Sequence, residues 1–134
     1  SRPLTDLGLF DRVLVDAPCS GLGTLRRNPD ARWRIQPRDV PRLAELQGAI
    51  LRQAAGVLRP GGTLVYSTCT VLPEENQGVI EAFLADVEGF QRAPRDELPA
   101  TVRPLVGEDD ALRTLPHRHE MDGFFAVRLR REAQ

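Results

Sequence analysis

The alternation of short apolar strands with amphipathic helices constrains this chain more than any other feature. Residues 10–16 include three consecutive branched apolar side chains, at 13–15, which predict a strand covered on both faces. Residues 63–67 predict a second strand, and residues 41–58 between them carry apolar side chains at helical spacing. Because a crossover helix returns the chain to the same end of a sheet, we expect the two strands to pair in parallel.

Proline and glycine indicate where the helices begin and end. Residues 59–62, Arg-Pro-Gly-Gly, predict the end of the first helix, because proline cannot continue it and glycine accepts the turn. Pro73 predicts the first turn of a second helix, where Glu74 and Glu75 complement the positive end of the helix dipole. The predicted apolar stripes are Leu43, Leu46, Ile50, Leu51, Ala54, Val57 and Leu58 in the first helix and Val79, Ile80, Phe83 and Leu84 in the second.

The end of the chain predicts antiparallel pairing. Residues 88–105 are interrupted by prolines and predict a connection with a short edge strand. Residues 112–115 and 124–129 predict a hairpin. The element order β-α-β-α-(β)-β-β predicts one α/β domain of parallel strands closed by an antiparallel hairpin, and 134 residues suffice for one such domain.

Composition argues against several classes of protein. No apolar run is long enough to span a bilayer and the N-terminus lacks a signal-peptide layout, so we expect a cytoplasmic protein without a membrane partner. The net charge of −1 gives no overall basic footprint for nucleic acid. All 18 basic residues are arginine, a side chain that suits phosphate, although the codon usage of a GC-rich genome explains the absence of lysine more simply.

The two cysteines, Cys19 and Cys69, each follow a predicted strand. Chemistry in open α/β sheets collects beyond the carboxyl ends of the strands, so we expect a paired-cysteine site at one sheet edge. A purely structural cysteine would lie within a strand and face the core. No metal site is predicted, because His117 and His119 are close together and no Cys-x-x-Cys pair accompanies them.

Nucleophilic chemistry by one thiolate, supported by the second thiol, is the remaining interpretation. Cys69 precedes the helix predicted at Pro73, and helix N-termini favour thiolates, so Cys69 is the better nucleophile. One interpretation of Arg26, Arg27 and Trp33 is that they hold phosphates and stack on nucleic-acid bases. The alternative for these three is a solvated loop with the indole packed on the domain.

Several separated motifs occur in a characteristic order. They are residues 10–21 (Phe-Asp-Arg-Val-Leu-Val-Asp-Ala-Pro-Cys-Ser-Gly), 26–30 with Trp33, 58–70 with 73–76, and 115–117 with 121–125. In this order they resemble the RNA cytosine-5 methyltransferases of the NOL1/NOP2/Sun type. The Arg-Arg-x-Pro-Asp element is most similar to the bacterial Sun (Fmu) branch, which methylates small-subunit ribosomal RNA. The resemblance implies a Rossmann-like class I methyltransferase fold, with residues 1–134 forming the C-terminal portion of the catalytic domain.

The resemblance also implies roles for three residues. Cys69 matches the cysteine that adds to C6 of cytosine, which lets C5 accept a methyl group from S-adenosylmethionine. Cys19 matches the cysteine that assists product release, and Asp16 matches the aspartate that lies against the cofactor. The target base must leave any stack to be reached. Ribosomal RNA is a more plausible partner than transfer RNA.

The cofactor loop and the ribose-binding acidic residue of the family would precede Ser1. We therefore expect residues 1–134 alone to bind S-adenosylmethionine weakly and to expose an apolar strand edge that favours self-association. Two alternatives remain at this point. One is a DNA cytosine-5 methyltransferase, in which the Pro-Cys cysteine is the nucleophile. The other is a non-catalytic fragment or module whose partner supplies the cofactor half.

Overall fold

The computed structural model describes residues 8–20, 38–70, 72–114 and 123–133. In chain order the described elements are β1 (Phe10–Asp16), α2 (Asp39–Ala55), β2 (Leu58–Thr68), η3 (Pro73–Glu75), α3 (Gln77–Asp86), β3 (Phe90–Arg92), η4 (Arg95–Glu97), η5 (Arg103–Leu105), β4 (Ala111–Thr114) and β5 (Phe124–Arg131), where η denotes a 3-10 helix. Within these residues no helix is both long and apolar enough to cross a membrane.

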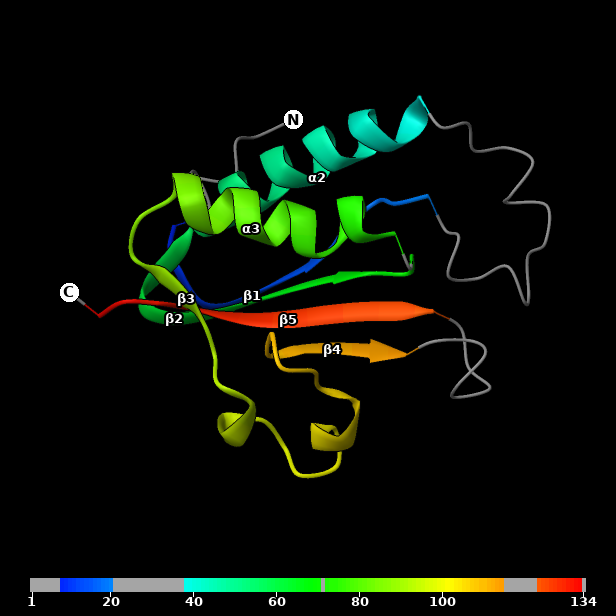
Figure 1. Cartoon of the computed structure of the whole chain (residues 1–134). Helices are drawn as coiled ribbons and strands as arrows, with labels where there is room; N and C mark the ends of the chain where they lie inside the picture. Colours follow the sequence, from blue (N-terminus) through cyan, green and yellow to red (C-terminus); the bar gives the residue numbers. More distant parts are fainter. Residues whose placement is uncertain (1–7, 21–37, 71, 115–122, 134) are drawn as a thin grey trace.

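One five-stranded sheet organises the described residues (Figure 1). β1 pairs with β2 in parallel, and β5 pairs antiparallel with β2 on one side and with β4 and β3 on the other. The predicted parallel pair, the closing hairpin and the short strand after α3 are therefore confirmed. β1 is an edge strand of this sheet, as expected.

The two long helices cover one face of the sheet, and the segment that carries η4 and η5 lies on the opposite face (Figure 1). The core fills the space between the sheet and the helices. Its largest buried members from the strands are Leu58, Leu64, Tyr66, Phe125, Val127 and Leu129, and those from the helices are Leu51, Ile80 and Phe83. Alternate residues of β2 and β5 supply this layer, which is the pattern of a sheet with a single well-covered face.

The exposure of two leucines differs from the prediction. Leu14 is 70% exposed, whereas the run around it predicted cover on both faces. The reason is its place on an edge strand, on the face opposite to the helices. Leu46 is 48% exposed, while the neighbouring Gln47 is fully buried. The prediction that Leu46 belongs to the buried stripe of α2 is therefore wrong.

The predicted ends of both helices also shift. α2 ends at Ala55, and residues 59–62 belong to β2 rather than to a turn. Pro73 opens a 3-10 turn, and the α-helix begins only at Gln77. Leu84 of that helix is partly buried rather than a member of the fully buried core.

Two glycines explain how the Arg-Pro-Gly-Gly segment can form part of strand β2. Gly61 has φ of +80°, a conformation that glycine adopts at little cost. A Cβ atom on Gly62 would lie 2.8 Å from the carbonyl oxygens of Asp11 and Arg59. The register of the β1–β2 pair shifts at this point, between Phe10 and Arg12. The close approach of β1 to β2 therefore requires glycine at position 62.

Tyr66 combines a buried ring with a satisfied hydroxyl. The ring packs edge-on against Phe125, and the hydroxyl donates a hydrogen bond of 2.8 Å to the backbone oxygen of Glu75. Burial, and secondarily the negative charges of Glu75 and Cys19, raise the pKa of Tyr66 far above its ordinary value. This phenol therefore stays neutral in the folded protein and connects β2 to the turn before α3.

We predict that Gly62→Ala destabilises the protein by about 1–3 kcal/mol, because the added methyl group overlaps two backbone oxygens of a tightly paired strand. Urea unfolding measures this loss. Gly56→Ala is the matched control: the φ of Gly56 is −66°, and its added Cβ would make only ordinary contacts. Equal stabilities of the two variants would contradict the close approach at Gly62.

We predict that Tyr66→Phe lowers the free energy of unfolding by about 1–2 kcal/mol near neutral pH, through loss of the hydrogen bond to Glu75. The difference in unfolding free energy between the wild type and Tyr66→Phe should narrow as the pH rises above 10.0, the ordinary pKa of tyrosine. There the unfolded state releases the phenol proton while the folded state keeps it, so rising pH favours unfolding of the wild type by up to about 1.4 kcal/mol per pH unit. Urea unfolding across this range tests the sign, and a constant gap would contradict it.

Candidate functional site

The two thiols meet at the carboxyl edge of the sheet. The parallel register sets Asp16 of β1 opposite Ser67 of β2, and the amide of Ala17 donates to the Ser67 carbonyl at 2.9 Å. The chain then leaves both strands on the same side, and the sulfur atoms of Cys19 and Cys69 lie 3.2 Å apart. Neither cysteine is in a disulfide, and both are half-buried. The predicted juxtaposition of the thiols is therefore confirmed.

A buried carboxylate lies beside the thiol pair. Glu75 is fully buried and accepts hydrogen bonds from the Ser20 amide at 2.7 Å, the Ser20 hydroxyl at 2.7 Å and Gln47 Nε2 at 3.1 Å. Gln47 Nε2 also donates to the Pro18 carbonyl at 2.8 Å. The Oε1 atom of Gln47 is buried without a hydrogen-bond partner. The backbone on both sides of Cys19 is therefore fastened to α2 and η3.

The loop that carries Cys69 is fastened separately. The Thr68 hydroxyl donates to Asn76 Oδ1 at 2.5 Å, and Asn76 Nδ2 donates to the Thr70 carbonyl at 3.0 Å. Both Thr68 and Asn76 are buried. Asn76 immediately precedes α3, so the start of this helix holds the residues on either side of the second thiol.

Asp16 ends β1 at the same edge. Its carboxylate is exposed and accepts a hydrogen bond of 3.2 Å from the Ser67 hydroxyl. A hollow of about 480 Å³ runs along β1 and reaches Asp16, with Ile50 and Ala54 of α2 in its wall. The carboxylate can therefore accept hydrogen bonds from a polar molecule at the carboxyl edge.

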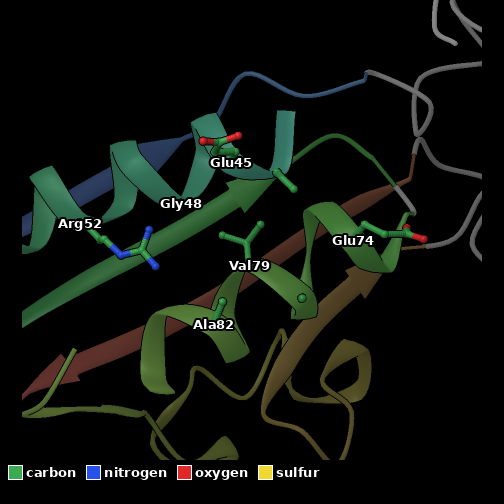
Figure 2. Close-up of a pocket in the computed structure, with 8 residues that line it drawn as sticks. Glu45, Gly48, Arg52, Glu74, Val79 and Ala82 are labelled. Atoms are coloured by element: carbon green, nitrogen blue, oxygen red, sulfur yellow. The ribbon is translucent and has the colours of Figure 1, made fainter. Parts of the chain in front are cut away.

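A second hollow, of about 260 Å³, lies between α2 and α3 (Figure 2). Its lining consists of Ala44, Glu45, Gly48, Arg52, Glu74, Gly78, Val79 and Ala82. Arg52 forms an ion pair with Asp86 at 2.9 Å. Neither thiol lines this hollow, and the thiol pair is therefore the stronger candidate for chemistry.

The sequence reasoning missed part of this site. Gln47 falls beside the predicted apolar stripe, whereas for Glu75 the sequence predicts a residue at the start of a helix and the resemblance places it near the active site. The available signal was the order of these residues along the chain. Gln47 follows the motif of Cys19, and Glu75 follows the motif of Cys69. The predicted RNA-binding residues Arg26, Arg27 and Trp33 lie outside the described residues, as do the two histidines. Among the described residues, no group of three or more His, Cys, Asp or Glu side chains could hold a metal ion.

Comparisons with known proteins agree with this architecture. Residues 2–130 match the family described as 16S rRNA methyltransferase RsmB/F. The probable ribosomal RNA small subunit methyltransferase B of Synechocystis sp. is 46% identical over 123 residues, and that of Bacillus subtilis is 48% identical over 125. Each alignment covers 92% of this chain and 28% of the relative. The chain therefore spans less than a third of these relatives.

Solved structures show the same fold. The crystal structure of NSun6 from Pyrococcus horikoshii with SFG has a TM-score of 0.78 and 32% identity, covering 98% of this chain and 32% of that one. The crystal structure of PH0851 has a TM-score of 0.80 and 38% identity, covering 89% of this chain and 26% of that one. These likenesses confirm the predicted Rossmann-like methyltransferase fold. The match over nearly its whole length shows that the chain belongs to the 16S rRNA methyltransferase RsmB/F family, within the NOL1/NOP2/Sun group.

Proposed function

We propose that the protein transfers a methyl group from S-adenosylmethionine to C5 of a cytosine in RNA, and that the RNA is 16S ribosomal RNA in the cytoplasm. The observation that carries this proposal is the thiol pair, with Cys19 and Cys69 at 3.2 Å on the carboxyl edge of the sheet. The names of the relatives, which are ribosomal RNA methyltransferases, support the choice of substrate.

Two thiols suit this reaction because C5 of cytosine is a poor nucleophile. In the proposed mechanism the Cys69 thiolate adds to C6, and the electron pair of the C5–C6 double bond then makes C5 nucleophilic. Once C5 carries the transferred methyl group, loss of the C5 proton to a base restores the C5–C6 double bond and expels the Cys69 thiolate. We assign assistance of this release to Cys19, whose sulfur is in contact with that of Cys69.

Asp16 is our candidate for contact with the cofactor. Its exposed carboxylate at the end of β1 fits hydrogen-bond donors such as the amino or hydroxyl groups of a nucleoside. The hollow along β1 that reaches Asp16 offers room beside it. S-adenosylmethionine, when bound, supplies an electrophilic methyl group. We also propose that Arg26, Arg27 and Trp33 contribute to RNA binding.

We predict opposite effects of the two cysteine substitutions on covalent RNA binding. Cys19→Ala should accumulate a protein–RNA adduct that survives denaturing electrophoresis, because Cys69 still adds to the base while release is impaired. Cys69→Ala should form no adduct, because no thiolate adds to C6. Both variants of the full-length protein should lose methylation of 16S ribosomal RNA, and Glu74→Ala serves as an exposed control.

The reversed pattern, with an adduct in Cys69→Ala only, would support the DNA-type assignment in which Cys19 attacks. Unchanged methylation in both cysteine variants would refute catalysis by either thiol. An absence of methylation in the wild type together with its cofactor would favour the non-catalytic module.

We predict that residues 1–134 alone bind S-adenosylmethionine weakly, because Asp16 is the single cofactor contact that the resemblance assigns to them. Isothermal titration calorimetry of this 134-residue chain measures the affinity. Tight, saturable binding that Asp16→Asn leaves unchanged would contradict both the weak affinity and the role of Asp16. The open edge of strand β1 should also favour self-association of residues 1–134, which analytical ultracentrifugation detects.

A further inference from the structure

The residues that directly follow the two cysteines are joined to each other. Ser20 follows Cys19, and Thr70 follows Cys69. Their hydroxyl oxygens lie 2.9 Å apart, and both residues are buried. A hydroxyl–hydroxyl contact thus runs beside the sulfur–sulfur contact and links the same two loops.

The direction of the hydrogen bonds in this contact follows from proton counting. The Ser20 hydroxyl has one proton and donates it to Glu75 Oε2 at 2.7 Å. The Thr70 hydroxyl must therefore donate to Ser20, and it accepts in turn from the Leu72 amide at 3.3 Å. The donors form one chain, from Leu72 through Thr70 and Ser20, that ends on the carboxylate of Glu75.

Glu75 is the point where this chain meets the backbone of the other loop. Its Oε1 atom accepts from the Ser20 amide and from Gln47, which also holds the Pro18 carbonyl. A bond to a charged group that is removed from water is stronger than a neutral one, and leaving such a group unpaired is costly. The carboxylate therefore opposes any movement of one thiol loop relative to the other.

We propose that Ser20, Thr70 and Glu75 form a clasp that sets the distance between the two thiols. The clasp is a positioning device, because its side chains contact the loops rather than the reacting atoms. Its catalytic meaning rests on the proposed function, in which two thiols act in turn on one cytosine. A shift of one loop by about 1 Å can cost such a reaction on the order of a hundredfold in rate.

Thiol–disulfide exchange with glutathione measures the clasp independently of methylation. Oxidation of the two thiols by glutathione disulfide forms the Cys19–Cys69 disulfide and releases two molecules of glutathione, so the equilibrium reports how well the thiols are held together. Peptide mapping by mass spectrometry identifies this disulfide in the full-length protein. The variants are Ser20→Ala, Thr70→Val, Glu75→Ala and Glu75→Gln, with exposed Glu74→Ala as the matched control.

Ser20→Ala, Thr70→Val and Glu75→Ala should each lower the equilibrium constant for disulfide formation by about tenfold or more, which corresponds to one lost buried hydrogen bond. Glu75→Gln should stay within about threefold of the wild type, because its amide can donate to Ser20 while its oxygen still accepts. Glu74→Ala should have the same equilibrium constant for disulfide formation as the wild type. In methylation assays the same three damaging variants should lower kcat more than they raise KM for RNA.

If folded Ser20→Ala and Thr70→Val have the same equilibrium constant for disulfide formation as the wild type, the clasp is refuted. Circular dichroism checks folding, and if Glu75→Ala does not fold, the two hydroxyl variants decide. Altered exchange without any methylation by the wild type would refute the proposed function and leave the clasp standing. Normal methylation with unaltered exchange in these variants would refute the clasp alone.

Discussion

The parallel pairing of β1 with β2 is the constraint on which the rest of the site depends. The register that sets Asp16 opposite Ser67 makes the two strands end within one residue of the same level. Cys19 and Cys69 are three and two residues beyond these positions, so the two loops emerge side by side. A change of register by one residue would turn the side chains of β1 to the other face and separate the thiols.

Holding this register requires close packing at one end of the strand pair and polar bonding at the other. Gly62 allows the β1 backbone to approach where a side chain would collide with Asp11. At the carboxyl end, Glu75 and Asn76 bind the loops that follow the strands. The start of α3 is thus part of the site, and Tyr66 ties the same turn back to the sheet. The turn before α3 therefore contacts both the thiol loops and the hydrophobic core.

Much of the architecture could be predicted because it follows from local patterns. The apolar runs, the helical spacing and the hairpin signal lead directly to the sheet, and the position of each cysteine after a strand leads to the thiol pair. The burial of Gln47 could not be predicted, because it depends on the amide reaching the Pro18 carbonyl across two elements. Residues 59–62 differ from the predicted turn for a similar reason: Gly62 makes a close strand contact that no local turn rule anticipates.

The most direct test of this account identifies the cysteine that bonds to RNA. In RNA whose target cytosine carries fluorine in place of the C5 hydrogen, methylation cannot be followed by loss of a proton, so the attacking thiol stays attached to C6. Digestion of the trapped full-length protein and mass spectrometry then locate the modified residue. The account predicts that the nucleotide is attached to Cys69. Attachment to Cys19, or the absence of an adduct under conditions where unmodified RNA is methylated, would contradict it.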